Sequence, residues 1–382
     1  MQTLNFQKII SEYKKLKCPT DVYNPCKLPF DRNKYFVICT ERSIGKTTNI
    51  LLFGMLAHKI HGTQIQYIRQ TEVMIEPKNM RQLFATIEKF DYIQKITKNR
   101  WTSVLYYARG WYYCNRDDNG KVIEQDEKPF MYCLAINRNM IYKSTYSAPD
   151  GDILIFDEFC SKFYPQDEFI DFCDLVKTII RERTSPIIFL LGNTIDRYHP
   201  YFSELELLNI TTSMPLGEHT ETITSGGTPI YIEFATREKT AEKIRLNKIF
   251  FGFRNKKLGS ITGADWSITP VQHIDKTDDP EIIAKNFYIN IESYLINLEL
   301  ATSEKYGLHI LAHFAKQTYP DSHIYSLENM LDYRYRYKLG HDKLDRLIWT
   351  LYERKKFYYQ SNNVGALVDK FIQRCKNDKR IY

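Results

Sequence analysis

Nine residues decide how the rest of this chain is interpreted: Thr40-Glu41-Arg42-Ser43-Ile44-Gly45-Lys46-Thr47-Thr48. An apolar run precedes them at 35–39, and apolar residues recur after them at helical spacing, so the segment connects a buried strand to a helix. In that context the segment predicts a Walker A loop, which binds the phosphates of a nucleoside triphosphate. Gly45 lets the backbone turn toward the phosphates, Lys46 reaches the β- and γ-phosphates, and the Thr47 hydroxyl ligates Mg²⁺.

The motif departs from the usual pattern at its first position, where Thr40 replaces a glycine. A basic turn capped by threonines is the alternative interpretation. On the nucleotide interpretation, the residues expected to bind ATP are Arg42, Ser43, Ile44, Gly45, Lys46, Thr47 and Thr48.

A second apolar run, at 153–156, ends in two adjacent carboxylates, Asp157 and Glu158. A strand this apolar is buried on both faces, as in a parallel sheet, and its polar end emerges where ligands bind in open α/β sheets. The run therefore predicts a Walker B element in which Asp157 holds Mg²⁺, directly or through water, and Glu158 polarises the attacking water. A solvated strand end would explain the two acids, but not their occurrence together with the phosphate loop.

A third apolar run, at 186–191, is followed by Gly192 and Asn193. An amide at this place can contact the γ-phosphate or the lytic water, so Asn193 is the predicted sensor. The alternative is a simple strand-end turn, since Gly-Asn is a common turn pair. A glutamate on one strand and a polar sensor on the next are typical of ASCE-type P-loop ATPases, in which a further strand lies between the two Walker strands.

Composition is compatible with a multidomain enzyme and argues against several other classes. The 382 residues allow two or three domains, and 43% hydrophobic residues suffice for a core. No apolar run approaches the ~20 residues of a membrane span, so we expect no membrane partner. The N-terminus lacks the pattern of a signal peptide, and the eight cysteines lack metal-binding spacing, so we expect them to be reduced.

The net charge of +7 is unevenly distributed, with eight basic and two acidic residues between positions 237 and 257. Such runs are usually solvated faces, but beside an ATPase they also fit contacts to DNA phosphates, which confer affinity without reading sequence. A second basic cluster, interleaved with tyrosines, lies between positions 333 and 358. The candidate DNA-binding residues of the first run are Lys243, Arg245, Lys248, Arg254, Lys256 and Lys257.

These patterns predict an α/β chain of three domains. Residues 1–237 form a P-loop ATPase domain with a mostly parallel sheet, 238–280 a small basic helical linker domain, and 281–382 a C-terminal α+β domain. Within them we expect a hairpin at 104–114 and helices near 80–90, 169–183, 326–336 and 363–375.

The chain resembles the DNA-packaging ATPases of phi29-like bacteriophages. The resemblance begins at Tyr23-Asn24-Pro25 and continues through the phosphate loop, and it covers most of the chain with region 238–280 the weakest. Further matching segments are Tyr67-Ile68-Arg69, Ile155-Phe156-Asp157-Glu158-Phe159, Arg181-Glu182-Arg183, Asn193 and Pro200-Tyr201-Phe202.

The resemblance implies a homomeric ring, expected to be a pentamer, docked at the portal of an empty procapsid in the host cytoplasm. There, hydrolysis of ATP with Mg²⁺ drives double-stranded DNA through a central pore. The resemblance also implies a C-terminal domain with a degenerate RNase H-like nuclease fold, and it places Asn24 and Pro25 at the nucleotide. Whether a structural RNA bridges motor and portal, as in some relatives, stays open.

The resemblance further implies that Arg181 acts across the subunit boundary. A guanidinium from a neighbour would neutralise charge on the γ-phosphoryl oxygens in the transition state. The alternative is that Arg181 and Arg183 pair with Glu182 or nearby acids at a helix end. One departure from the family is Glu72, which stands where relatives have a basic residue. A second trans-acting cation would therefore have to come from elsewhere, from Arg69 or Lys78 for example.

Two other functions compete with the packaging motor. A terminase-type enzyme that also cuts DNA needs two or three acids at adjacent strand ends to hold metals ~4 Å apart. The C-terminal strands offer Glu292 and Glu299 singly, which argues against cutting. A nucleotide-dependent switch would bind ATP without needing Glu158.

Overall fold

A computed structural model of the chain describes residues 4–40, 44–161, 164–165, 167–193, 197, 199–236, 271–274, 279–291, 294–327, 332–337, 339 and 343–377. The chain divides into two compact units, Met1–Trp266 and Ser267–Tyr382, and each is considered by itself. Most of the expected linker lies outside the described residues, as do several predicted site residues. These are Arg42, Ser43, Lys243, Arg245, Lys248, Arg254, Lys256 and Lys257.

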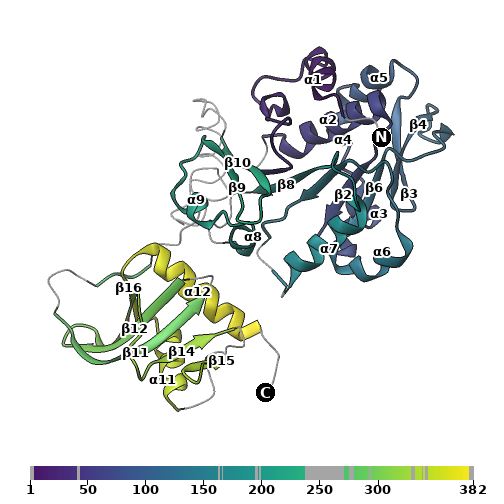
Figure 1. Ribbon diagram of the computed structural model, residues 1–382. Helices are drawn as coiled ribbons and strands as arrows, with labels where there is room; N and C mark the ends of the chain where they lie inside the picture. The colour runs from purple at the N-terminus through teal and green to yellow at the C-terminus, as the bar shows by residue number, and fades with distance from the viewer. Residues whose placement is uncertain are drawn as a thin grey trace. The chain divides into compact units, whose positions relative to one another are not determined.

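The first unit is built on one large, mostly parallel sheet with the strand order β3-β4-β6-β2-β7-β8-β1-β10-β9 and β5 paired with β4 (Figure 1). The six strands from β6 to β10 in that order run parallel to one another, and antiparallel strands flank them. The predicted parallel sheet is therefore confirmed. Its strands are β1 (Tyr35–Thr40), β2 (Ile65–Arg69), β3 (Ser103–Tyr107), β4 (Gly110–Arg116), β5 (Val122–Gln125), β6 (Met131–Ala135), β7 (Ile153–Asp157), β8 (Ile187–Asn193), β9 (His219–Ile223) and β10 (Pro229–Ala235).

Helices cover both faces of this sheet, which explains why its central strands are apolar throughout. Figure 1 shows α1, α2, α4 and α5 on one face, and α6 and α7 on the other. The helix expected at 80–90 is in fact broken, because α3 ends at Met80 and α4 begins at Ala85. The helices are α1 (Phe6–Lys15), α2 (Lys46–His61), α3 (Pro77–Met80), α4 (Ala85–Lys89), α5 (Tyr92–Thr97), α6 (Asn139–Thr145), α7 (Glu168–Ile180), α8 (Pro200–Glu204) and α9 (Leu208–Ser213), with short 3₁₀ turns η1 (Pro25–Lys27), η2 (Glu72–Ile75) and η3 (Ile136–Arg138).

Helix α2 packs closely against the sheet, and it begins at the predicted phosphate loop. It starts after Gly45 and ends before Gly62, both in the left-handed region, with φ of 71° and 73°. Such values favour glycine. In its middle, a Cβ on Gly54 would lie 2.7 Å from Ile65 Cδ1, so the helix backbone packs directly against β2.

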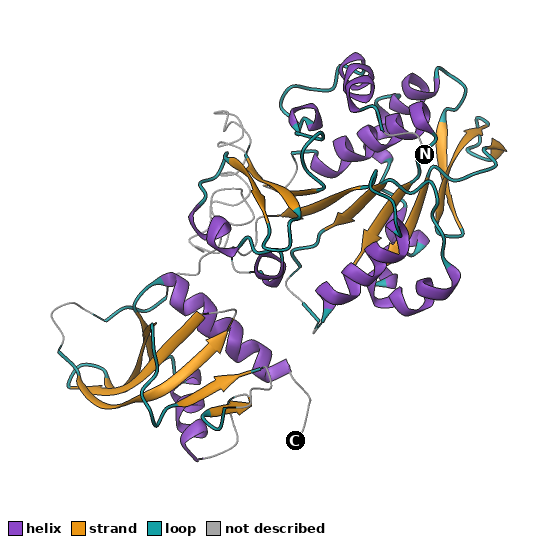
Figure 2. Cartoon of the chain, viewed as in Figure 1, coloured by secondary structure: helices purple, strands orange, loops and turns teal. Residues whose placement is uncertain are grey.

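The second unit contains a six-stranded sheet with the order β15-β14-β11-β12-β13-β16 (Figure 2). β11, β12 and β13 form an antiparallel meander; β14 adds parallel to β11, β15 parallel to β14, and β16 parallel to β13. None of the described helices in either unit is long and apolar enough to span a bilayer. The elements are β11 (Glu281–Ile291), β12 (Tyr294–Ser303), β13 (Gly307–Phe314), β14 (His323–Ser326), β15 (Tyr335–Tyr337), α11 (Lys343–Glu353), β16 (Phe357–Tyr359) and α12 (Asn362–Asn377).

One predicted helix of this unit is wrong. Residues 326–336 were expected to be helical, but Ser326 ends β14, and Tyr335 and Arg336 lie in β15. Tyrosine and arginine alternate from 333 to 337, and this two-residue period is that of a strand. The helix lies further along the chain, as α11, whereas the helix expected at 363–375 is confirmed as α12.

Candidate nucleotide-binding site

The strand order brings the predicted motifs to one edge of the sheet. β8 lies between β7 and β1, as the glutamate and sensor pattern predicted. Thr40 pairs in register with Asn193, and Asp157 with Leu191. Because these strands are parallel, the loop after β1, the acids after β7 and Asn193 all emerge at the same carboxyl edge. This is the edge at which open α/β sheets bind ligands.

The described part of the phosphate loop has the backbone that the motif requires. A Cβ on Gly45 would lie 3.0 Å from Asn49 Nδ2 and 3.3 Å from Val22 Cβ, so space and a φ of 71° both favour glycine. Ile44 is only 4% exposed, so its backbone rather than its side chain can face a nucleotide. Thr48 is half-buried in the first turn of α2.

Lys46 is a buried cation that reaches across the sheet. Its side chain is nearly enclosed, and Nζ donates a hydrogen bond of 3.0 Å to the carbonyl oxygen of Gly192 on β8. Burial lowers the pKa of Lys46, and the negative charge of Asp157 opposes that change. An ammonium with two further N–H donors at this edge is well suited to phosphate oxygens.

Thr47 and Asp157 form the predicted metal pair. The Thr47 hydroxyl donates to Asp157 Oδ1 at 3.0 Å, and the buried Tyr67 hydroxyl donates to Oδ2 at 2.8 Å. Burial raises the pKa of Tyr67 well above its usual value, with a further contribution from Asp157. A hydroxyl and a carboxylate in contact are oxygen ligands of the kind that Mg²⁺ prefers, so these residues fit a magnesium ion.

Arg69, at the end of β2, contacts both Walker B acids of its own chain. Its Nη2 lies 2.5 Å from Glu158 Oε2, and Nη1 lies 3.4 Å from Asp157 Oδ2. Glu158 is 52% exposed and has a φ of 60°, unusual for a glutamate, while its N–H donates to Leu191 O at 2.7 Å. Sequence reasoning named Arg69 only as an alternative trans-acting cation. The available signal was its position directly after Ile65-Gln66-Tyr67-Ile68, a segment rich in strand-forming residues.

The Glu72 carboxylate also forms ion pairs within its own chain. The Glu72 carboxylate accepts from the guanidinium groups of Arg109 and Arg138, which approach from the β3–β4 turn and from η3. Lys78, the other alternative cation, lies 3.0 Å from Glu76.

Arg181 and Arg183 lie in different environments, one exposed and the other buried. The Arg183 guanidinium is buried, lies 2.6 Å from Asp152 Oδ1 and donates to four backbone carbonyl groups at 2.8–3.2 Å and to that of Ile180 at 3.3 Å. Arg181 is exposed, and its guanidinium makes no hydrogen bond or ion pair within the described part of the chain. Since Asp152 immediately precedes β7 and Glu158 follows it, Arg181 lies at the opposite edge of the sheet from Glu158.

We expect Arg183→Ala to destabilise the first unit by about 3–5 kcal/mol, because it leaves the Asp152 carboxylate without its cationic partner and several carbonyl groups without their donor. Arg181→Ala should change the free energy of unfolding by less than about 0.5 kcal/mol, because that side chain is exposed. Urea unfolding followed by circular dichroism measures both. Equal effects of the two substitutions would contradict the assignment of Arg183 to the fold.

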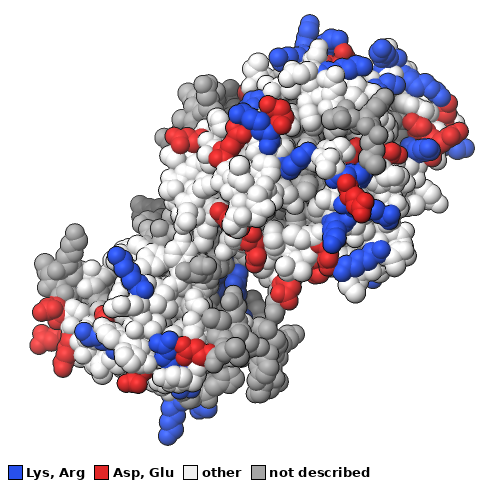
Figure 3. Space-filling model, viewed as in Figure 1, with Lys and Arg blue, Asp and Glu red and all other residues white. Residues whose placement is uncertain are grey.

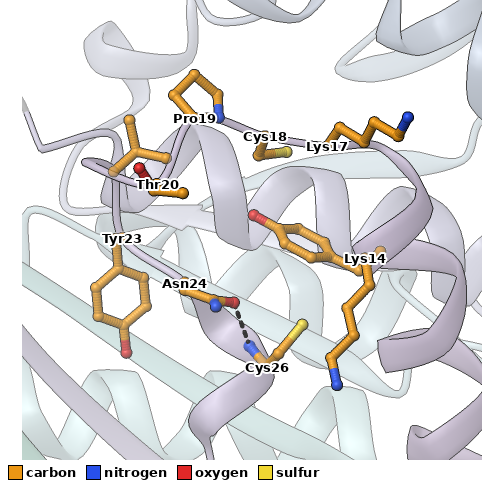
Figure 4. Close-up of a pocket in the computed structure, with 10 residues that line it drawn as sticks. Lys14, Lys17, Cys18, Pro19, Thr20, Tyr23, Asn24 and Cys26 are labelled. Carbon is orange, nitrogen blue, oxygen red and sulfur yellow. Dashed lines mark hydrogen bonds between the residues drawn. The ribbon is translucent and has the colours of Figure 1, made fainter.

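A cavity of about 230 Å³ adjoins the phosphate loop (Figure 4). The Tyr23 N–H donates to Ile44 O at 2.8 Å, which joins the cavity wall to the loop. Asn24 Oδ1 accepts from the Cys26 N–H at 3.0 Å and so caps η1, which begins at Pro25. The cavity can therefore receive the nucleoside part of a nucleotide whose phosphates lie on the loop. Its lining residues are Tyr13, Lys14, Lys17, Cys18, Pro19, Thr20, Val22, Tyr23, Asn24 and Cys26.

Two solved structures are similar to this chain over nearly its whole length. The Phi-28 gp11 DNA packaging motor is 15% identical, with a TM-score of 0.56 over 95% of this chain and 100% of that one. The bacteriophage Phi-29 viral genome packaging motor assembly is 17% identical, with a TM-score of 0.56 over 93% and 100%. No protein-family model and no curated protein matches the chain. The chain therefore shares the fold of phi29-like packaging motors, which confirms the resemblance at the level of fold.

Proposed function

We propose that this chain is the ATPase subunit of a motor that moves double-stranded DNA into a preformed viral procapsid. The observation that carries the proposal is the convergence of Lys46, Thr47, Asp157 and Glu158 on one sheet edge, in a fold shared with packaging motors. On this proposal the chain acts as a pentameric ring at the procapsid portal in the host cytoplasm, with DNA in the pore. A packaging RNA is a further candidate partner.

Hydrolysis follows from the side chains at that edge. Gly45 and Lys46 hold the phosphates, while Thr47 and Asp157 hold Mg²⁺, which supplies charge neutralisation when bound. Glu158 orients and polarises the attacking water, and Asn193 reads the γ-phosphate. Arg69 Nη2 lies 2.5 Å from Glu158 Oε2 and so orients the carboxylate, whose second oxygen, Oε1, can accept the proton of the water. A triphosphate at the same edge offers Arg69 another anionic partner.

The second catalytic residue is Arg181, acting in trans. Its guanidinium lies at the edge opposite Glu158 of its own chain, so the site it can serve is that of a second copy. An interface in which one edge of a subunit meets the other edge of its neighbour is heterologous, and it closes into a ring when the rotation permits. Hydrolysis in one subunit then depends on the position of the next.

We propose that the C-terminal unit is a degenerate RNase H-like domain and that a small basic linker domain at 238–280 precedes it. An antiparallel meander followed by strands added in parallel to its first strand supports this assignment. Glu299 on β12 lies 3.5 Å from His313 on β13, and Glu292 lies outside the described residues. Metal-dependent cleavage of plasmid DNA by the full chain would favour the terminase-type alternative instead.

We assign DNA binding to the basic run that contains Lys243 and Arg254. Figure 3 shows acidic and basic side chains mixed over the visible face of the described residues, without one dominant sign. The basic run between 237 and 257 is the candidate for phosphate contacts because it carries eight basic and two acidic residues.

We expect DNA-stimulated ATP hydrolysis to fall steeply as salt rises. Six phosphate contacts correspond to a loss of about 10³ in DNA affinity between 50 and 200 mM salt. The measurement is steady-state ATPase activity against DNA concentration at several salt concentrations, with DNA-free activity at the same salt as control. Stimulation that does not weaken with salt would exclude an electrostatic grip.

A further inference from the structure

One buried carboxyl group behind the site has no part in the hydrolysis described above. Glu168, in the first turn of α7, is 2% exposed. Its Oε2 accepts a hydrogen bond of 2.5 Å from the side-chain amide of Gln70. Gln70 directly follows Arg69, whose guanidinium holds Glu158. Two contacts, Glu168 with Gln70 and Arg69 with Glu158, therefore connect Glu168 to the proposed water-activating carboxylate.

The amide of Gln70 is held from both ends. Its Oε1 accepts from the Ser161 hydroxyl at 3.2 Å, and Ser161 O lies 3.0 Å from His199 Nε2. His199 stacks on Tyr201 with ring centroids 5.7 Å apart, and the Tyr201 hydroxyl adjoins the Glu168 carboxyl group. These contacts join the end of β2, the segment after Glu158 and the start of α8 in one buried network.

We propose that Glu168 is a positioning residue for ATP hydrolysis: through Gln70 it fixes the end of β2, from which Arg69 holds Glu158. The inference rests on the proposed function, because it assumes that Glu158 activates water. Site geometry within a few tenths of an ångström depends on such supporting hydrogen bonds. Burial of a carboxylate costs free energy and adds no hydrophobic stabilisation. We therefore attribute the role of Glu168 to its hydrogen bond, which orients the Gln70 amide.

The same group gives the site a pH dependence. Burial raises the pKa of Glu168 to about 7, and the hydrogen bond from Gln70 and the nearby Tyr201 hydroxyl oppose that rise. The other titratable groups near it are Asp171 on α7, and Tyr164 and His199, which surround Tyr201. Below pH 7 the carboxyl group becomes neutral and accepts the Gln70 hydrogen bond more weakly. We therefore expect kcat to fall as the pH is lowered through about 7.

Three substitutions test the positioning role. Glu168→Ala and Gln70→Ala should each lower kcat roughly tenfold at all pH values, with the KM for ATP changed less than about twofold. Glu168→Gln retains a neutral acceptor for Gln70 but cannot titrate, so its kcat should stay close to that of the unsubstituted chain at low pH and lack the rise through about pH 7. Glu88→Gln is the matched control, because Glu88 is a half-buried, hydrogen-bonded glutamate remote from the site.

Mixed rings locate the defect. Glu168→Ala subunits retain Arg181, so mixing them with Arg181→Ala subunits should restore hydrolysis at the sites of the latter. Mixing them with Glu158→Gln subunits should not restore it, because the impaired site belongs to the Glu168→Ala subunit itself. The reverse pattern would overturn the proposal by placing the effect on Arg181.

A stability measurement reports on Glu168 without requiring activity. A carboxyl group whose pKa is higher in the folded chain binds more protons when folded, so its contribution to the unfolding free energy decreases as pH rises from about 4.5 to 7. Glu168→Gln should remove this dependence, and its persistence would overturn the titration. If Glu168→Ala hydrolyses ATP with unchanged kcat, the positioning role is wrong. If the unsubstituted chain hydrolyses no ATP, the proposed function fails and this role fails with it.

Discussion

Mixing Glu158→Gln subunits with Arg181→Ala subunits is expected to restore ATP hydrolysis that neither variant supports alone. Glu158→Gln removes the group that polarises water but leaves Arg181 to serve the neighbour. Arg181→Ala leaves its own Glu158 intact and lacks only the guanidinium for the next site. A mixed ring therefore contains complete sites, each with Glu158 from one subunit and Arg181 from the other. Loss of a trans-acting arginine lowers the rate by about 10³–10⁵ in other NTPases, so the recovery should be large.

The measurement is steady-state ATPase activity as a function of mixing ratio, with a maximum near equal amounts. Glu158→Gln mixed with Lys46→Ala is the matched control, because both lesions lie in the same subunit's half of the site and no complete site forms from them. Substantial activity of Arg181→Ala alone would contradict the trans assignment. The Glu158→Gln variant also separates a motor from a nucleotide switch, because a motor loses packaging with hydrolysis whereas a switch does not.

Lys46→Ala is expected to lower ATP hydrolysis by at least about 10²–10³, because it removes the buried ammonium that faces the phosphates. Burial disfavours the charged form of Lys46 and lowers its pKa, whereas the hydrogen bond of 3.0 Å to Gly192 O favours the native side chain. Because these two effects oppose each other, we expect only a small change in stability, and loss of activity can then be assigned to the phosphates rather than to unfolding. Binding of a fluorescent ATP analogue and thermal unfolding, measured on the same preparation, check both statements.

Lys46→Arg provides the control for charge. It retains the positive charge but places a planar guanidinium where a compact ammonium lies against Gly192 O at 3.0 Å, so it should also fail. Unaltered nucleotide binding by both variants would mean that the turn after Thr40 does not bind phosphates.

Several elements could be predicted because each is encoded by a continuous stretch. The apolar runs before Asp157 and Asn193 predicted buried strands, and both are central strands of the sheet. The order of a glutamate strand and a sensor strand predicted that β8 lies between β7 and β1. The misplaced helix at 326–336 shows the limit of this reasoning, because residues 333–337 alternate as a strand within a segment otherwise favourable to helix.

Sequence patterns alone predicted a phosphate loop, the two acids at the end of β7, the parallel sheet that brings these segments together, and a C-terminal α+β domain. These features depend on residues near one another in the chain, whose spacing fixes local backbone and burial. Three contacts could not be predicted in this way: Arg69 pairs with Glu158, Gln70 donates to Glu168, and Arg183 pairs with Asp152 while Arg181 is exposed. Those contacts join residues that are distant in sequence. They exist because strand order and helix packing place them side by side, which no local pattern specifies.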